Sequence, residues 1–458
     1  MSTVIKGGTL VSSGGLQIAD ILIEGEKISR IAPELQGDRV VDVSGCLVFP
    51  GFIDAHTHLE MPVSGTVTAD SFQTGTAAAI AGGTTTILDF ATQDKGGSLQ
   101  QALDVWHSRA DGHCSCDYGF HMAICDWNEN TRSQLREMAA AGVTSFKCYL
   151  AYDALMVSDA QLYDILTEMK KIGGVLGVHC ENGPVLDLLR ERAVRSGALS
   201  PAWHPRTRPA LLEGEAVSRF LRLAGLAGVP SWVVHLSTVD GLEEIRLARR
   251  RGQTVYVESC PQYFTLDERL YESPGFEGAK YVCSPPLRSR EDQAALWEAL
   301  SAGEIDLIST DHCSFNFKGQ KDLGLRDFTL IPNGMPGIEH RAAVMYTAGV
   351  ASGRISVQEL CRVLSENPAK LFGLYPKKGL LAPGSDADIA IYDPSRDSII
   401  TAAHQYQNCD YSPYEGFKTA GSLRDVFLRG VQVFKDGELI LPGTGRYLSR
   451  GQAFRSPE

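Results

Sequence analysis

The sequence of 458 residues lacks the features that mark several classes of protein. No run of about 18 apolar residues is present, so no membrane-spanning helix is expected. The first residues, MSTVIKGGTL, lack the basic stretch and apolar core of a signal peptide. Positive charge is scarce, because 43 Lys and Arg stand against 55 Asp and Glu and give a net charge of −12. We therefore expect neither a nucleic-acid nor a membrane partner.

The cysteines lack the pattern of a disulfide framework. There are eleven, an odd number, and only Cys114 and Cys116 lie close together in the sequence. This pattern favours free thiols in a reducing cytoplasm. Hydrophobic residues make up 43% of the chain and charged residues 21%, which is a globular composition and excludes wholesale disorder.

Both ends of the chain read as β-structure. Residues 1–50 and 376–458 contain short apolar runs, such as VIKGGTLV and DVFLRGVQVF, punctuated by Gly, Asp and Ser. We expect these two segments to pair into one small β-sandwich domain beside a central domain formed by residues 51–375. The basic tail, TGRYLSRGQAFRSPE, is expected to be either a mobile arm or a strap between subunits.

The central segment alternates short β-branched runs with longer helical patterns. Eight such units predict parallel strands with helical crossovers, closed into a (β/α)₈ TIM-like barrel. The alternative is an open doubly wound sheet, but its G-x-G-x-x-G turn is absent. The expected strands are residues 51–58, 84–90, 117–124, 145–151, 174–181, 231–237, 254–260 and 306–312.

Metal-ligand residue types stand at the ends of these expected strands. His56 and His58 are two residues apart, so both point to the same face of a strand and can reach one ion. His179, His235 and Asp311 lie near the ends of three further strands. Because catalytic residues of barrel enzymes come from the carboxyl ends of several strands, we predict a metal site at the barrel mouth.

Lys147 is unusual because it lies in the expected strand TSFKCYL among apolar neighbours. Burial there disfavours the ammonium and lowers the lysine pKa. A neutral amine can react with carbon dioxide to form a carbamate, an anion with two oxygens suited to bridge two cations. The alternative is a lysine paired with a nearby carboxylate.

These motifs resemble the amidohydrolase superfamily, and within it the D-hydantoinase and dihydropyrimidinase family. The resemblance is carried, in unbroken order over nearly the whole chain, by GFIDAHTHLE, TSFKCYLAY, GVHCEN, VVHLS, SPPLR, STDHCSF, IPNGMPGIEHR and KLFGLYPKKGLLAPGSDADIAIYDP. It implies a cytoplasmic homotetramer that hydrolyses a small cyclic amide, such as a 5-substituted hydantoin.

The resemblance also implies a role for individual residues. Two divalent metal ions, usually Zn²⁺, would be bound by His56, His58 and Asp311 and by His179 and His235, with the carbamate of Lys147 bridging them. Asp311 would move the proton from the attacking hydroxide to the leaving ring nitrogen. Tyr152 would donate to the developing oxyanion, and Ser284 and Asn333 would hold the imide edge of the ring.

The loops at the barrel mouth carry apolar side chains that suit a hydrophobic ring substituent. We expect Leu59 and Met61, together with Tyr149, Leu155 and Met156, to form this cup. Five cysteines also fall near the expected mouth, and we interpret them as small buried hydrophobic residues rather than catalytic thiols. They are Cys148, Cys180, Cys260, Cys283 and Cys313.

Three alternatives remain open at this point. A dihydropyrimidinase opens a six-membered ring by the same chemistry. Allantoinases and dihydroorotases resemble the same family but carry Arg or Asn soon after H-x-H, where this chain has Leu59, Glu60 and Met61. A non-catalytic scaffold related to dihydropyrimidinase would have lost metal ligands, whereas all six ligand positions are kept here.

Overall fold

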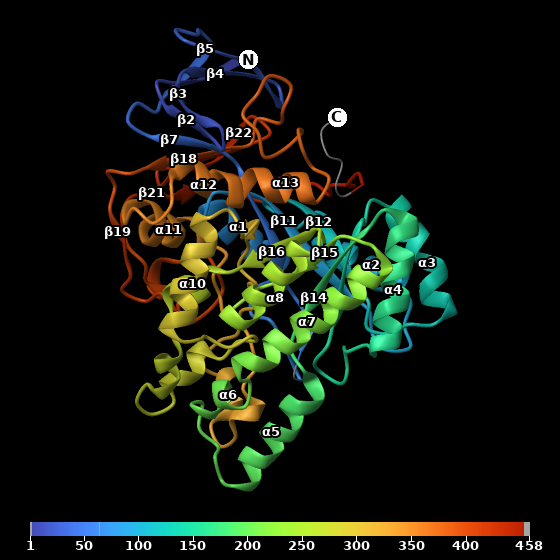
Figure 1. Cartoon of the computed structure of the whole chain (residues 1–458). Coiled ribbons are helices and arrows are strands. Elements are labelled where there is room, and N and C mark those ends of the chain that lie inside the picture. Colours follow the sequence, from blue (N-terminus) through green and yellow to red (C-terminus); the bar gives the residue numbers. More distant parts are fainter. Residues whose placement is uncertain (1, 64, 453–458) are drawn as a thin grey trace.

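A sheet of eight parallel strands forms the centre of the molecule (Figure 1). In this computed structural model, which describes residues 2–63 and 65–452, the strands follow chain order around the sheet. The first and last strands are joined by a Thr57–His312 bridge, and the His58 N–H donates to the His312 carbonyl oxygen at 2.8 Å. This closure confirms the predicted (β/α)₈ barrel and excludes the open sheet. The strands are β8 (Phe52–Thr57), β11 (Thr84–Thr92), β12 (Asp117–Ala123), β13 (Ser145–Tyr149), β14 (Val175–His179), β15 (Ser231–Val233), β16 (Val255–Ser259) and β17 (Leu307–Ile308).

The barrel strands form where β-branched and aromatic residues cluster. Every residue of β12 and β13 is buried, which is typical of parallel strands with helices outside and packed side chains inside. Most strands end slightly short of their predicted limits, and β15 and β17 are much shorter than predicted. β15 ends at Val233 and β17 at Ile308, because the chain turns away soon afterwards through His235 and Asp311, whose φ angles are positive.

Helices cover the outside of the barrel. Five of them begin at a serine whose side chain accepts from a backbone N–H of the first turn, namely Ser71, Ser98, Ser158, Ser289 and Ser356. Within the described ranges no helix is long and apolar enough to cross a membrane. The α-helices are α1 (Phe72–Ala81), α2 (Leu99–Ala110), α3 (Glu129–Ala140), α4 (Asp159–Ile172), α5 (Gly183–Arg195), α6 (Trp203–Arg206), α7 (Ala210–Ala227), α8 (Val239–Arg250), α9 (Pro261–Thr265), α10 (Arg290–Ser301), α11 (Arg341–Met345), α12 (Val357–Cys361) and α13 (Asn367–Leu371).

Shorter helical turns complete the barrel domain and the segment that follows it. Two of them are π-helical and continue α11 and α12, and the others are 3₁₀ turns. They are η1 (Glu268–Glu272), η2 (Glu277–Tyr281), η3 (Lys321–Gly324), η4 (Phe328–Leu330), η5 (Tyr346–Ala351), η6 (Arg362–Glu366) and η7 (Ala402–His404).

The two chain ends meet in a β-sandwich, as the sequence predicts (Figure 1, blue and red strands). One sheet has the order β5-β4-β1-β6, and the other, β23-β22-β21-β18-β7-β2-β3, mixes strands from both ends. Apolar side chains such as Ile21, Val48 and Ile389 fill the space between the sheets. The strands are β1 (Ser2–Lys6), β2 (Thr9–Ser12), β3 (Gly15–Ile18), β4 (Asp20–Glu24), β5 (Lys27–Ala32), β6 (Arg39–Asp42), β7 (Leu47–Pro50), β18 (Ile389–Asp393), β21 (Ser422–Leu428), β22 (Val431–Lys435) and β23 (Glu438–Leu439).

Two small two-stranded sheets lie outside these sheets, β9 (Pro62–Val63) with β10 (Thr66–Val67) and β19 (Ser398–Ile399) with β20 (Lys418–Thr419). The chain passes from β7 into β8 at Gly51, close to the predicted limit between residues 50 and 51. The domain limits 1–50, 51–375 and 376–458 themselves stay a prediction.

A buried ion cluster joins the sandwich to the barrel. Lys378 Nζ lies 2.7 Å from Asp117 of β12, 2.5 Å from Asp388 and 3.3 Å from Asp386. Three carboxylates this close resemble a cation site, but the lysine ammonium already supplies the positive charge. The cluster is therefore a structural link at the end of the barrel opposite to the mouth.

The basic tail is not a mobile arm through residue 452, whereas its role as a strap between subunits stays a prediction. The Leu448 N–H donates to the Tyr118 carbonyl oxygen at 2.7 Å, and Arg450 Nη1 donates to Ser145 Oγ at 2.8 Å. Since Tyr118 and Ser145 belong to β12 and β13, this segment packs on its own barrel. Residues 453–458 lie outside the described residues.

Candidate active site

Four imidazoles meet at the carboxyl ends of the barrel strands. His56 lies on β8 with His58 just beyond it, His179 ends β14, and His235 follows β15. The Nδ1 atom of His179 is 3.0 Å from Nε2 of His235. The ring centroids of His56 and His235 are 5.5 Å apart, and those of His56 and His58 are 5.1 Å apart. The strand-end residues predicted from the sequence are thus gathered in one buried cluster.

Asp311 joins this cluster from the loop after β17. Its Oδ1 atom lies 3.2 Å from Nε2 of both His56 and His58. Burial raises the pKa of Asp311, but the hydrogen bond from His58 and the charges around it outweigh burial, and the net shift is downward. Asp311 is therefore a carboxylate at neutral pH, available as a ligand or as a proton acceptor.

Lys147 projects from β13 into the same cluster and is almost completely buried. Its Nζ lies 2.8 Å from His56 Nε2 and 4.3 Å from the centroid of the Phe90 ring. Within the described chain no carboxylate forms an ion pair with Lys147. The structure therefore does not support the alternative of a lysine paired with a nearby carboxylate. Burial lowers the pKa of Lys147, although the charges of Asp311 and Glu258 act in the other direction. This environment favours the uncharged amine.

Backbone strain is concentrated at the mouth. Tyr152, His235 and Asp311 have φ angles of +70°, +40° and +51°, in the left-handed region that residues with a side chain seldom adopt. Such strain persists only where the surrounding structure holds it, and it is common at functional sites. The local fold therefore gives up some stability to aim these three side chains.

The protonation states of the imidazoles suit metal binding. Burial lowers the pKa of both His56 and His235 well below the usual histidine value, so both rings are neutral near pH 7. The buried Nδ1 atoms of His58 and His235 have no hydrogen-bond partner in the described chain. Neutral imidazoles, a carboxylate and an uncharged amine form a donor set that fits divalent transition metals.

A cavity of about 560 Å³ opens onto this cluster. Most of the predicted site residues line it, namely His58, Lys147, His179, His235, Asp311, Tyr152, Ser284, Asn333 and Met61. Asn333 Nδ2 donates to Ser284 Oγ at 3.0 Å, and both side chains are close enough to the Tyr152 phenol to oppose the upward shift of its pKa. Burial raises the pKa of Tyr152, so its phenol stays a hydrogen-bond donor at neutral pH.

The comparison with known families agrees with this geometry. The model of the amidohydrolase family matches residues 47–433, which span the barrel and the sandwich strands β7, β18 and β21. The chain belongs to the amidohydrolase family.

This amidohydrolase resembles characterised relatives over its full length. It is 45% identical to D-hydantoinase of Geobacillus stearothermophilus, with 99% of this chain and 97% of the relative covered. It is 44% identical to D-hydantoinase of Streptomyces coelicolor, with 98% of each covered. Among solved structures, dihydropyrimidinase from Brevibacillus agri is 44% identical, covers 100% of both chains and superposes with a TM-score of 0.98.

Several residues that support the amidohydrolase site were missed by sequence reasoning. Glu258 of β16 is fully buried, and its Oε1 lies 2.5 Å from His56 Nδ1. Glu181 accepts from His179 Nε2 at 2.8 Å and pairs with buried Arg208 at 2.6 Å. These carboxylates orient the imidazoles and leave the opposite ring nitrogen for a metal. The motifs VYVESC and GVHCEN contain both, but the contacts depend on distant parts of the chain.

Leu59 does not belong to the apolar cup that was predicted to hold the ring substituent. Its side chain is fully buried beneath the mouth, where it packs against Gly75 of α1, and it does not line the cavity. The chain turns after His58, so Leu59 faces the layer between barrel and helices. Met156 is also absent from the cavity wall, whereas Met61, Tyr149 and Leu155 contribute to it.

The cysteines of the amidohydrolase are all buried and free, in agreement with the predicted free thiols. Of the five near the mouth, only Cys313 lines the cavity. Burial raises the pKa of Cys283 to about 12 and raises that of Cys313 as well. Both thiols are therefore protonated at neutral pH and are poor nucleophiles.

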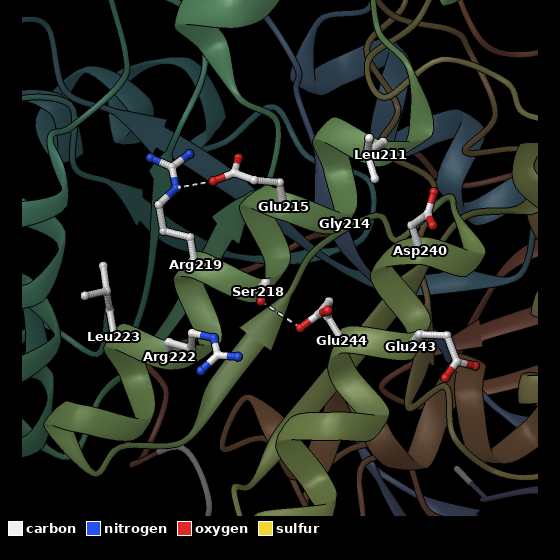
Figure 2. A pocket seen from close by; sticks show the side chains of 10 residues that line it. All are labelled: Leu211, Gly214, Glu215, Ser218, Arg219, Arg222, Leu223, Asp240, Glu243 and Glu244. Atoms are coloured by element: carbon white, nitrogen blue, oxygen red, sulfur yellow. Dashed lines mark hydrogen bonds and ion pairs between the residues drawn. The ribbon is translucent and has the colours of Figure 1, made fainter.

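A second hollow of about 650 Å³ lies on the outside of the barrel between α7 and α8 (Figure 2). Its charged side chains largely satisfy one another, since Arg219 pairs with Glu215 at 3.2 Å and Ser218 donates to Glu244 at 2.7 Å. None of its lining residues is an imidazole or a thiol. The chemistry of this amidohydrolase therefore belongs to the mouth.

Proposed function

We propose that this enzyme hydrolyses the cyclic amide bond of 5-substituted hydantoins to give N-carbamoyl amino acids, and that it also accepts dihydropyrimidines. The observation that carries the proposal is the convergence of four imidazoles, Asp311 and Lys147 on a cavity of about 560 Å³ in a member of the amidohydrolase family. Full-length similarity to proteins named D-hydantoinase supports the hydantoin ring as the substrate.

The proposed metal centre holds two divalent ions, most simply Zn²⁺, in this donor set. His56, His58 and Asp311 would bind one ion, and His179 and His235 would bind the other. Lys147, carboxylated by CO₂, would bridge the two. When bound, the ions lower the pKa of a water molecule towards neutrality and polarise the substrate carbonyl. The lowered pKa of Lys147 supports this, because carbamate formation needs the uncharged amine.

Asp311 is the proposed acid–base residue. In the hydrolysis, the water oxygen forms a bond to the ring carbonyl carbon and the carbon–nitrogen bond breaks. Asp311 accepts the proton that the water loses and delivers it to the leaving ring nitrogen. Its low pKa supports the first half of this transfer, since the carboxylate must be ionised before it can accept a proton.

Tyr152 is the proposed donor to the carbonyl oxygen as negative charge develops there. Its phenol lines the cavity together with Ser284 and Asn333, which are the residues proposed to hold the imide edge of the ring. The ring substituent then lies against Met61, Tyr149 and Leu155, an apolar and aromatic surface that suits a phenyl group.

A turnover screen tests the proposed function. Purified enzyme supplied with Zn²⁺ is incubated with 5-phenylhydantoin, dihydrouracil, allantoin and dihydroorotate, and ring opening is measured in each case. We expect turnover of 5-phenylhydantoin, slower turnover of dihydrouracil, and none of the two more polar rings. Turnover of allantoin or dihydroorotate alone contradicts the assignment, and no turnover of any ring favours the dihydropyrimidinase-related scaffold.

Dihydropyrimidinase proper is the second candidate function. A solved structure of that name superposes with a TM-score of 0.98. A higher kcat/KM for dihydrouracil than for 5-phenylhydantoin supports this candidate over the first.

We also propose a homotetramer located in the cytoplasm. Eleven buried free thiols support a reducing compartment, and the exposed apolar side chains of Leu323, Leu325 and Leu330 support an interface between subunits. Light scattering after size-exclusion chromatography measures the mass, and a monomeric mass contradicts the tetramer.

A further inference from the structure

Two peptide groups directly precede Ser284 and Asn333, which line the cavity where the imide edge of the ring is proposed to bind. One joins Cys283 to Ser284, and the other joins Pro332 to Asn333. The two loops are tied together, because the Gly334 N–H donates to the Val282 carbonyl oxygen at 3.0 Å. Neither the Ser284 N–H nor the Asn333 N–H donates to a backbone carbonyl within the described residues. Both N–H groups are thus free to meet a ligand.

Lys321 holds the oxygen side of one of these peptide groups. It lies on η3 and is completely buried, and its Nζ is 2.7 Å from each of three carbonyl oxygens, those of Val282, Pro332 and Gly334. An ammonium has three N–H donors, and all three are used here. Burying a charged group without a carboxylate partner is unfavourable, so the burial of this lysine lowers the free energy of unfolding.

His204 holds the oxygen side of the other peptide group. It lies on α6, is buried, and its Nε2 is 2.7 Å from the Cys283 carbonyl oxygen. Burial and the nearby charge of Arg208 lower the pKa of His204 to about 3. The ring is therefore neutral at working pH, and its proton must be on Nε2 for this hydrogen bond to form.

We propose that Lys321 and His204 are positioning residues that aim the Asn333 and Ser284 N–H groups at the substrate. A peptide unit is planar and trans, so its C=O and N–H point in opposite directions, and holding the oxygen fixes the direction of the N–H. Donation to the oxygen also polarises the peptide and strengthens its N–H as a donor. This inference rests on the proposed function.

The pH dependence of substrate binding follows from the number of donors on Lys321. Burial lowers the pKa of Lys321 to about 8. The neutral amine has only two N–H groups for three carbonyl oxygens, so one loop loses its support. The groups that face the ammonium are the Phe315 ring and three thiols. Burial raises the pKa of two of these, Cys283 and Cys409, to about 12, and raises the pKa of the third, Cys313, further still.

Matched variants test the proposal. Lys321→Met removes every donor at similar length, and Lys321→Gln keeps two. His204→Leu removes the donor, whereas His204→Gln keeps an N–H that reaches the same oxygen. We measure kcat and KM for the ring that the wild-type enzyme opens best, together with the metal content and the midpoint of thermal unfolding. If Lys321→Met gives no folded protein, the comparison of His204→Leu with His204→Gln tests the proposal instead.

The expected result is a rise in KM with little change in kcat. Loss of one aimed hydrogen bond should raise KM about tenfold in Lys321→Met and His204→Leu, and the Gln variants should recover most of this. The wild-type KM should rise above pH 8, and this rise should be absent in Lys321→Met. Metal content should stay at the wild-type value in every variant, since none of these side chains contacts a proposed ligand.

Three outcomes would overturn the proposal. An unchanged KM in folded Lys321→Met and His204→Leu contradicts the positioning role. So does a Gln variant as impaired as its apolar counterpart, because that pattern reports packing rather than donation. If the wild-type enzyme neither opens a cyclic imide nor binds one in calorimetry, the proposed function fails and this inference fails with it. The wild-type measurement therefore separates the two kinds of failure.

Discussion

Replacing Tyr152 by phenylalanine removes one hydroxyl group from the cavity and leaves the ring in place. The ring lies with its centroid 5.4 Å from that of His179 and under the Arg208 guanidinium at 5.5 Å. The Tyr152 carbonyl oxygen accepts from the N–H groups of Leu155 and Met156, both at 2.8 Å, and this turn holds the strained backbone without the hydroxyl. The fold and the metal ligands should therefore survive the change.

The size of the effect follows from the proposed role. Loss of one donor to a developing oxyanion costs about 3–4 kcal/mol in the transition state, so kcat should fall about 10²- to 10³-fold. Ser284 and Asn333 keep their mutual hydrogen bond at 3.0 Å, so stability should fall by only about 1 kcal/mol. Because burial raises the pKa of Tyr152, the wild-type phenol remains a donor up to at least pH 10, the ordinary tyrosine value.

The assay is steady-state ring opening, with metal content measured on the same preparations. Tyr149→Phe is the matched control, since Tyr149 lines the same cavity from β13 and its ring centroid is 5.9 Å from that of His179. We expect the control to keep kcat within about threefold of wild type, a change below the size of one hydrogen bond. A Tyr152→Phe enzyme as fast as the control, with its metal intact, would refute the oxyanion role.

Three further predictions concern groups around the site and the barrel. Glu258→Gln should weaken metal binding about 10- to 100-fold, as measured by competition with a chelator, and an unchanged affinity would contradict its role in orienting His56. Lys378→Met should lower the free energy of unfolding by about 3–5 kcal/mol in urea, because buried Asp388 loses the ammonium that neutralises it, whereas Asp117 keeps Arg429 and Asp386 keeps Lys27, and an unchanged midpoint would contradict this. Burial lowers the pKa of His340 to about 4, so its contribution to stability is complete above pH 6.5 and is lost as the pH falls towards 4. His340→Gln should weaken the pH dependence of unfolding in that interval, and an identical dependence in both proteins would exclude this cause.

The barrel and the residues proposed as metal ligands could be predicted because both depend on local pattern. Alternation of strands and helices identifies the carboxyl ends of the strands, and His56, His179 and His235 occur at those ends. His56 and His58 are two residues apart at the end of one strand, and this spacing brings both imidazoles to the same carboxylate oxygen, Asp311 Oδ1.

The supporting residues could not be predicted because they depend on contacts between distant segments. Glu258 is 202 residues from His56, and Lys321 contacts Val282, 39 residues away, through backbone oxygens that carry no sequence signal. Leu59 was assigned to the cavity from its place beside His58, but the turn after β8 directs it into the core. Side-chain direction just after a strand depends on the turn, and the two-residue period no longer applies there.

Metal analysis of the freshly purified protein tests the central claim most directly. Mass spectrometry of the metals, divided by the protein concentration, should find two divalent ions per chain after growth with zinc. Lys147→Ala should hold fewer than two ions per chain, and its activity should return only when a short carboxylate is added. A wild-type protein that holds no more than one ion per chain even after dialysis against Zn²⁺ and bicarbonate, or a Lys147→Ala variant with full metal content and full activity, would contradict the account.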